Sequence, residues 1–355
     1  MAIQVNGTQV IGNSRELTNI ASVDATTVAT LNAGGVGGGG IAYGSTYVPY
    51  ILNADAGQSP GHIAYDASED KFVTVDWGTS QGASWKSADG TGKSWVENAH
   101  DTDIQYARGG LAASGNGTFV AACNNGKIAR STNLGGSWAS VAPSYSGAGG
   151  AGGDWCSINY GNGVFIGGYR DQYIFRSTND GVSWSQPTNP AGAGYLLDDA
   201  ANDGGNNWLG VALNRIIKST DNGATWTDLG AKNAPGGTPN WYQIAYGNGK
   251  WVKAGQSGWV GSSTNLGSTW TYKQVTNQNF AADSGTYGSG GFIFANGGTP
   301  GGFGQSVSGS AGDFLLTAPD AKFASTNLYH AAQNTTTNAA IFTARGARIL
   351  VRYET

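Results

Sequence analysis

The chain has 355 residues, with 59 glycines, 12 tryptophans and 16 tyrosines, and only 12% of its residues are charged. This composition favours short strands joined by tight turns around an aromatic core, and it argues against long helices and charged tails. A net charge of −4, two cysteines and no apolar run of membrane-spanning length argue against charge-driven nucleic-acid binding, a disulfide framework and membrane insertion.

Residues 1–40 precede the repeats and are expected to form a separate N-terminal segment. The stretch IQVNGTQVIGN (3–13) predicts a small hairpin because Asn-Gly suits its turn, and LNAGGVGGGG (31–40) is typical of a flexible link. The first residues lack the basic start and apolar run of a signal peptide, so we expect no signal-directed export.

One phrase returns through the middle of the chain. Its copies are STNLGGSW (131–138), STNDGVSW (177–184), STDNGATW (219–226), STNLGSTW (263–270) and the looser SADGTGKSW (87–95). SVSGSAGDF (306–314) is a degraded sixth copy, with Phe in the place of Trp. The closing tryptophans recur every 42–46 residues, a period typical of repeat architectures.

A second phrase keeps step with the first. YGNG or a variant of it occurs at 114–117, 160–163, 246–249 and 287–290, between alternating apolar runs, which is a strong hairpin signal. Each unit therefore predicts two strands around this turn, a third strand that ends in Ser-Thr, and a fourth that begins near the Trp. Four antiparallel strands in about 44 residues predict the blade of an all-β propeller.

The clear repeats cover about 60–317, enough for six blades. Residues 41–53 begin with the same IAYG as 244–247, and 340–353 carries two alternating runs around Arg-Gly. A blade made from both chain ends would close the ring and remove its edge strands, so we favour seven four-stranded blades within residues 41–355. The alternative is six blades followed by a small C-terminal module.

Each residue type in the repeated phrase has a structural role that accounts for its presence. Asn or Asp can accept hydrogen bonds from backbone N–H groups two or three residues on, Gly supplies a left-handed turn, and Trp places its ring between blades. None of these roles needs a substrate, and calcium binding is disfavoured because most of the acidic positions hold neutral Asn. The residues concerned are Ser131, Asn133, Gly135, Trp138, Ser177, Asn179, Gly181, Trp184, Ser219, Asp221, Gly223, Trp226, Ser263, Asn265, Gly267 and Trp270.

This phrase, Ser-X-Asp/Asn-X-Gly-X-Ser/Thr-Trp, resembles the Asp-box or BNR repeat of sialidase-like propellers, and it lies between strands three and four as in that family. The resemblance covers most of the chain and implies fold more than activity. The start of the chain, with its IQVNGTQVI…NSR…LTNI phrase, resembles the beginnings of tail-fibre and other structural proteins of marine tailed bacteriophages. That second resemblance covers about 25 residues. It implies attachment to other virion proteins through residues 1–35 and a homo-oligomer, with a trimer as one form.

The sialidase resemblance implies an arginine cluster, a Tyr–Glu pair and an acid/base Asp, and the sequence departs from this pattern. The early Arg-Ile-Pro phrase is absent, and Glu16, Glu69, Glu97 and Glu354 are the only glutamates. Arg130, Arg176 and Lys218 share one repeat position, which favours a structural role. Other glycosidases need only two carboxylates, so Asp101, Asp103, Asp154 and Asp171 remain alternatives.

Loops from strand two to strand three, and from one blade to the next, share one face and vary most. Variable loops on a rigid frame commonly carry function, because aromatic rings stack on sugars while Arg and Asp bind hydroxyl groups. The candidate ligand-binding residues on this face are Tyr145, Tyr169, Arg170, Asp171, Tyr173, Tyr195 and Trp241.

We therefore expect a non-enzymatic virion protein, without cofactor or metal, that uses a propeller to bind host-surface glycan or receptor or neighbouring subunits. One alternative is a sialidase-like or other glycan hydrolase carried on the virion. A second is a cellular scaffold or assembly factor built on a similar propeller.

Overall fold

The computed structural model describes residues 3–5, 8–11, 45–51, 59–77, 82–98, 101–105, 107, 109–123, 127–141, 155–169, 173–192, 194–276, 280–288, 291–296, 302–317, 328–334, 339–344 and 348–354. The chain divides into two compact units, Met1–Tyr43 and Gly44–Thr355. In the first unit, β1 (Ile3–Val5) pairs antiparallel with β2 (Thr8–Ile11), so a hairpin forms where the Asn-Gly turn predicts one. The glycine-rich stretch 31–40 lies outside the described residues.

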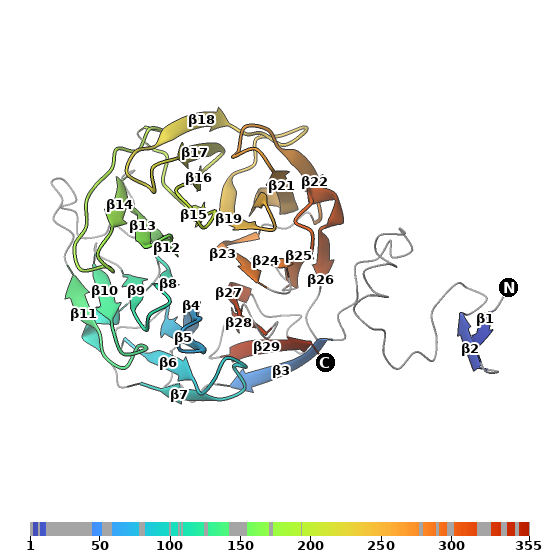
Figure 1. Ribbon diagram of the computed structural model, residues 1–355, viewed down its shortest axis with the longest axis horizontal. Coiled ribbons are helices and arrows are strands. Elements are labelled where there is room, and N and C mark those ends of the chain that lie inside the picture. The colour runs from blue at the N-terminus through green and yellow to red at the C-terminus, as the bar shows by residue number, and fades with distance from the viewer. Residues whose placement is uncertain are drawn as a thin grey trace. The chain divides into compact units, whose positions relative to one another are not determined.

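The second unit is an all-β propeller of four-stranded antiparallel blades, as the repeats predict (Figure 1). The first blade contains β4 (Pro60–Asp66), β5 (Lys71–Asp76), β6 (Ser84–Ser87) and β7 (Trp95–Glu97). The next contains β8 (Leu111–Ala113), β9 (Phe119–Ala122), β10 (Ile128–Ser131) and β11 (Ala139–Val141).

Three more blades of this kind follow one another along the chain. The first comprises β15 (Asp199–Asn202), β16 (Trp208–Ala212), β17 (Arg215–Ser219) and β18 (Thr227–Ala231). The second comprises β19 (Trp241–Gly247), β20 (Lys250–Gly255), β21 (Trp259–Ser263) and β22 (Thr271–Gln274). The third comprises β23 (Phe280–Gly288), β24 (Gly291–Asn296), β25 (Gly302–Ser306) and β26 (Leu315–Thr317).

One further sheet joins the two ends of the propeller unit. It contains β27 (Leu328–Gln333), β28 (Ala340–Ala344) and β29 (Arg348–Glu354), and its fourth strand is β3 (Ser45–Ile51) from the start of the unit. Strands β3 and β29 pair in continuous antiparallel register from Arg348 opposite Ile51 to Glu354 opposite Ser45. The pairing therefore brings together segments from opposite ends of this unit.

The sheet between the β8–β11 and β15–β18 blades has three strands, β12 (Trp155–Gly161), β13 (Val164–Tyr169) and β14 (Tyr173–Ser177). Only an isolated bridge between Arg176 and Ser185 marks the place of a fourth strand. The prediction of seven four-stranded blades is therefore wrong, because only six described sheets of the propeller unit have four strands. The physical reason is local, because Pro187 and Pro190 follow the Trp here and cannot donate backbone hydrogen bonds to a ladder.

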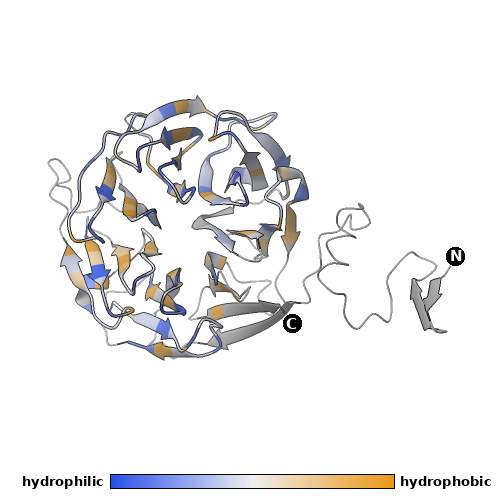
Figure 2. Ribbon diagram, in the orientation of Figure 1, coloured by the Kyte–Doolittle hydropathy of each residue, from blue (hydrophilic) through white to orange (hydrophobic). Residues whose placement is uncertain are grey.

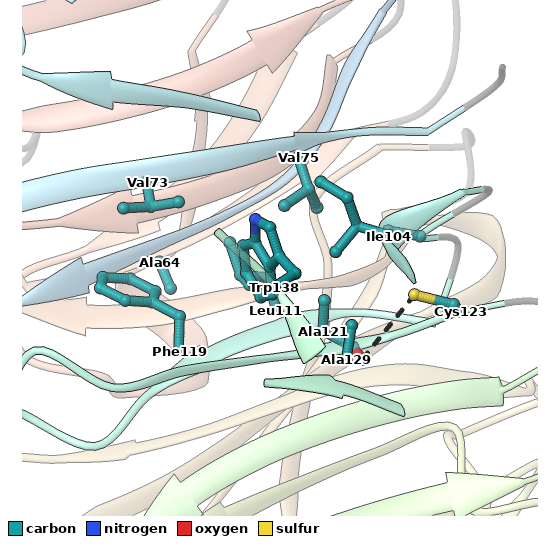
Figure 3. Packing of buried hydrophobic residues seen from close by; sticks show 11 residues of the cluster. Ala64, Val73, Val75, Ile104, Leu111, Phe119, Ala121, Cys123, Ala129 and Trp138 are labelled. Carbon is teal, nitrogen blue, oxygen red and sulfur yellow. Dashed lines mark hydrogen bonds between the residues drawn. The ribbon is translucent and has the colours of Figure 1, made fainter. Parts of the chain in front are cut away.

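The innermost strands contact one another in the order β4, β8, β12, β15, β19, β23, β27 and back to β4 (Figure 1). Hydrophobic residues are concentrated on the strands, whereas the turns are more hydrophilic (Figure 2). The core lies between blades. In the cluster drawn in Figure 3, Val73 and Val75 of one blade meet Phe119 and Trp138 of the next, and all four side chains are buried.

The repeated phrase forms a turn between the third and fourth strands, which we call the repeat corner (residues 131–138, 177–184, 219–226 and 263–270). The corner serine accepts a hydrogen bond from the glycine N–H four residues on, at 2.9–3.1 Å. The Asn or Asp carboxyl or amide oxygen accepts from the Ser or Thr N–H that is also four residues on, at 2.8–3.0 Å. The predicted donors two or three residues on are therefore wrong. The two residues after the Asn or Asp both take positive φ, and the N–H four residues on reaches the side-chain oxygen instead.

Each corner also contacts the neighbouring blade. A methyl group at Gly135, Gly181, Gly223 or Gly267 would meet the second strand of the preceding blade, at Val73, Val120, Ile166 or Leu209 respectively. Arg130 Nε donates to the carbonyl of Asp180 (2.6 Å), and Arg176 Nε donates to that of Asn222 (2.8 Å). These arginines occupy one repeat position, and each binds the corner of the blade that follows its own.

Gly223→Ala tests whether close packing at the corner stabilises the propeller. Its φ is +79°, and the added methyl would lie 2.5 Å from Ile166 Cδ1. Gly163→Ala is the matched control, because its φ of +76° is similar but no atom lies within 4 Å of the added methyl. We expect Gly223→Ala to lower the free energy of unfolding by about 1–3 kcal/mol more than the control, measured by urea denaturation.

Ile166→Val, which removes the opposing methyl, should recover part of the loss in the Gly223→Ala background. Equal losses at Gly223 and Gly163, or no recovery, would contradict the packing role of the corner.

Candidate functional site

Of the seven candidate ligand-binding residues from the sequence, the structure describes four, and these four do not form one site. Tyr145, Arg170 and Asp171 lie outside the described residues. Tyr169 and Trp241 are 2% and 0% exposed, so their assignment as ligand contacts was wrong. Tyr173 and Tyr195 are half-buried and lie in different parts of the propeller.

Trp241 is buried because it begins an inner strand instead of ending a loop. Its ring stacks on that of Tyr272 at 5.9 Å, and Lys253 Nζ lies 3.7 Å from its centroid. The same ammonium lies 4.4 Å from the Trp270 ring and donates to the Lys232 carbonyl at 3.1 Å. Burial, with the nearby Lys232 charge, holds the pKa of Lys253 well below its usual range. Trp241 and Lys253 are fully buried here, while Trp270 and Tyr272 are half-buried at the edge of the cluster.

The three candidate tyrosines that the structure describes also have structural partners. Tyr169 and Tyr173 both contact the Phe175 ring, at centroid distances of 6.3 and 6.4 Å. The Tyr195 ring lies 5.1 Å beneath the Arg215 guanidinium, which pairs with Asp228. These contacts account for the tyrosines as packing residues.

The candidate catalytic carboxylates are engaged with backbone. Asp101 accepts from the N–H groups of Asp103 (3.0 Å) and Trp138 (2.8 Å), and Asp103 accepts from Ser140 N–H (3.0 Å). Both therefore fasten the short 3-10 turn Thr102–Ile104 to the fourth strand of its blade. Asp154 and Asp171 lie outside the described residues.

The inner strands carry two equivalent layers of residues around the propeller axis. The first layer, which we call the inner belt, lies three residues before the position that holds Tyr65, Tyr160 and Tyr246 in three of the strands. Among the described side chains, six of the seven inner strands contribute to it: His62, Leu111, Ser157, Asp199, Gln243 and His330. Several of these side chains bind the next blade. Ser157 Oγ donates to the Leu197 carbonyl (3.3 Å), Asp199 Oδ2 accepts from Ile244 N–H (2.8 Å), and Gln243 Nε2 donates to the Ala295 carbonyl (3.3 Å).

The second layer lies two residues further along each strand and is almost entirely small. It contains Ala64, Ala113, Asn159, Ala201, Ala245, Thr286 and Ala332. Asn159 stands out because it places an amide where most blades have a methyl group.

Two adjoining cavities of about 180 and 350 Å³ lie among the inner strands. Both are lined by Ala113, Tyr160, Gly285 and His330, so they are neighbouring parts of one hollow, which we call the central cavity. The smaller part is also lined by Ser157, Asn159 and Asp199. Residues of the inner belt and the Asn159 amide thus line the same cavity.

Burial shifts the titration of the polar groups at the central cavity. Desolvation raises the pKa of Asp199 to about 7, although hydrogen bonds from the Ile244 and Ala200 N–H groups oppose the shift. It also raises the pKa of the adjacent Asp198 to about 6. Burial and the neighbouring His62 hold the pKa of His330 well below its usual range, and the two imidazole rings lie 5.1 Å apart. At neutral pH the His330 imidazole is therefore uncharged.

Within the part of the chain that the structure describes, no three His, Cys, Asp or Glu side chains are grouped to hold a metal ion. Cys123 is a buried thiol whose pKa is raised to about 12 by burial. No described helix is long and apolar enough to cross a membrane.

The central cavity was not predicted from the sequence. The inner belt holds His, Leu, Ser, Asp or Gln at equivalent positions, so no shared residue type marks it. The register was nevertheless readable in part, since IAYD (63–66), INYG (158–161) and IAYG (244–247) directly follow three of the belt residues, His62, Ser157 and Gln243.

Comparisons with known proteins support the fold alone. No family model matches the chain, and no curated protein matches it. Among solved structures, YCF48 bound to D1 peptide is 15% identical, with a TM-score of 0.63 over 87% of this chain and 95% of that one. The WD40 propeller domain of Doa1 is 11% identical, with a TM-score of 0.63 over 88% and 98% of the two chains.

A catalytically inactive virginiamycin B lyase from Staphylococcus aureus with quinupristin is 16% identical, with a TM-score of 0.66 over 87% of this chain and 99% of that one. These neighbours include an enzyme and non-enzymes, so they do not decide an activity. What the chain shares with them is the β-propeller fold.

Asp199→Asn tests the burial of the inner-belt carboxyl. The folded protein holds this proton more tightly than the unfolded chain, whose carboxyl has a pKa near 3.8. The contribution of Asp199 to stability is therefore fully present below about pH 4, falls as pH rises towards 7, and levels off above the folded-state pKa. The substitution can also change stability by an amount that does not depend on pH. Beyond that constant change, the melting temperature of the variant relative to the wild type should rise between pH 4 and 8. The corresponding change in the free energy of unfolding is a few kcal/mol at most.

Asp221→Asn is the control, because the equivalent corners hold Asn133, Asn179 and Asn265 and hydrogen bonds to Ser219 and Thr225 lower the pKa of Asp221. Its difference from the wild type should stay flat between pH 5 and 8. A flat difference for Asp199→Asn as well would contradict the raised pKa.

Proposed function

We propose that the protein is a binding protein of a tailed-bacteriophage virion, whose propeller engages host-surface glycan or receptor or a neighbouring virion subunit. The N-terminal phrase at residues 3–20 suggests the virion, and the division into Met1–Tyr43 and Gly44–Thr355 fits an attachment segment followed by a binding domain. The repeat corners fit the Asp-box propellers that their residues resemble.

The observation that favours binding over hydrolysis is that the described carboxylates already accept hydrogen bonds from within the chain. Asp199 is the one carboxyl that lines the described central cavity, and both its oxygens already accept backbone N–H groups. Glycosidic hydrolysis by the usual mechanisms needs two carboxyl groups across the bond. Every aspartate whose side chain the structure describes accepts a hydrogen bond from elsewhere in the chain, as Asp66, Asp101 and Asp203 illustrate.

We also propose that the three-stranded β12–β14 sheet occupies a blade position, which gives the ring seven blades. Its inner strand packs against both β8 and β15, as an inner strand between two blades would. The Arg176 contact to the corner at Asn222 supports the same placement.

Virion location can be tested by mass spectrometry of purified particles of the virus that encodes the chain. We expect the protein in particles at a fixed copy number, and we expect a virus whose chain lacks residues 1–43 to assemble without it. The truncated protein should keep a cooperative melting transition in isolation, so that lost incorporation reports lost attachment and not unfolding. Absence of the full chain from particles would contradict the virion proposal.

Binding without hydrolysis can be tested by incubating the full chain with host-cell polysaccharide. We expect retention of the protein on host cells or on the polysaccharide without release of reducing sugar. Release of reducing ends would instead support a hydrolase, and stable association with a cellular complex in the absence of particles would support a scaffold.

A further inference from the structure

The central cavity holds polar atoms that the protein itself leaves unused. Asn159 Nδ2 and His330 Nδ1 are buried, and neither makes a well-formed hydrogen bond to a described residue, although the Asn159 amide lies close enough to Asp199 to oppose the rise in its pKa. Both residues line the 180 Å³ part of the cavity, on β12 and β27. A buried polar group without a partner costs roughly 1–3 kcal/mol, so these two atoms favour an occupant that bonds to them.

The surrounding groups restrict the charge of that occupant. Among the described residues, Asp199 is the one acidic residue that lines the cavity, and its oxygens already accept backbone N–H groups. His330 is neutral at pH 7 because burial and His62 lower its pKa, and the described lining of both parts of the cavity contains no Lys or Arg. A charged occupant would lose its hydration without a counter-charge, which favours a neutral one.

The volume of the smaller part of the cavity limits the size of an occupant there. A volume of 180 Å³ corresponds to about six water molecules, which suits one small ring or a short polyol rather than a drug-sized ligand. Tyr160 borders both parts of the cavity, and its ring is held by Phe165 at a centroid distance of 4.7 Å. An aromatic ring at the junction offers an apolar face beside the polar atoms.

We infer that the central cavity binds a single neutral polyhydroxylated ligand, a sugar ring or a polyol of that size. A hydroxyl group is both donor and acceptor, so adjacent hydroxyls can accept from Asn159 Nδ2 and pair with His330 Nδ1 whichever tautomer is present. The inference goes beyond virion attachment, because it concerns this cavity whether or not the propeller is part of a particle.

Asn159→Ala is the central variant. Alanine already occupies the equivalent position at Ala64, Ala113, Ala201, Ala245 and Ala332, so the blade should accept it. Asn206→Ala is the matched control, because it removes an exposed amide whose contact is with Asn162 on the hairpin turns. Ala113→Leu provides a second test, because it fills the cavity without removing a hydrogen bond.

The experiment is saturation-transfer NMR and calorimetric titration of the full chain with glucose, galactose, mannose, N-acetylglucosamine, their methyl glycosides, inositol and glycerol. We expect saturable binding of at least one of them, weakened about tenfold or more by Asn159→Ala and by Ala113→Leu but unchanged by Asn206→Ala. Binding of a methyl glycoside would identify the terminal sugar of a larger glycan as the source, and binding of free sugars or polyols alone would identify a small metabolite.

Three results would overturn the inference. One is the absence of saturable binding across the panel, with ordered water alone in the cavity. Another is binding that neither cavity variant weakens, which would place the sugar elsewhere. The third is preferential binding of acetamide, included as a probe, which would assign the cavity to a carboxamide. None of these outcomes depends on virion location, which mass spectrometry of particles tests separately.

Discussion

The contact on which the propeller depends is the one between a repeat corner and the blade before it. At Gly223 the corner backbone lies so close to Ile166 that a single added methyl would overlap it, and the same approach recurs at the other three corners. Arg130 and Arg176 reach the carbonyls of the same turns from the preceding blades. At these four corners a blade is wedged against the one before it, and a buried hydrophobic cluster fills the space between the two blades.

This outer fastening is matched by polar contacts near the axis. Ser157, Asp199 and Gln243 each bind a backbone group of the following blade, so the inner strands are connected by side chains as well as by packing. The second layer is small, which leaves a hollow along the axis. Because the blades are joined both at the repeat corners and at the inner belt, residues around the central cavity can vary without changing the arrangement of the blades.

Much of the fold was readable because its signals are local. Asn-Gly turns and the Ser-X-Asn-X-Gly corner specify their own backbone conformations, so their spacing predicted the blades before any long-range contact was known. The missing strand after Trp184 was also readable in principle from Pro187 and Pro190, although the strength of the repeat favoured a full blade.

The candidate site was harder to predict, because burial depends on partners distant in the sequence. Trp241 follows a loop-like stretch, yet the stacking of Tyr272 and the approach of Lys253 place it in the core. Asn159 carries no motif of its own. It becomes notable only once the register of the inner strands aligns it with alanines in other blades.

The pairing of β3 with β29 has a consequence for biosynthesis. Strand β3 leaves the ribosome before the rest of the propeller, yet its hydrogen-bond partner, β29, is translated after all the other strands of the propeller. Until then β3 has an unpaired edge, and the blades already formed make an open arc that joins its two ends only after β29 has been translated. Closing so long a loop costs little more entropy than closing a shorter one, since the cost grows only with the logarithm of length. The delay in ring closure is therefore set by the order of synthesis more than by the thermodynamics of the final pairing.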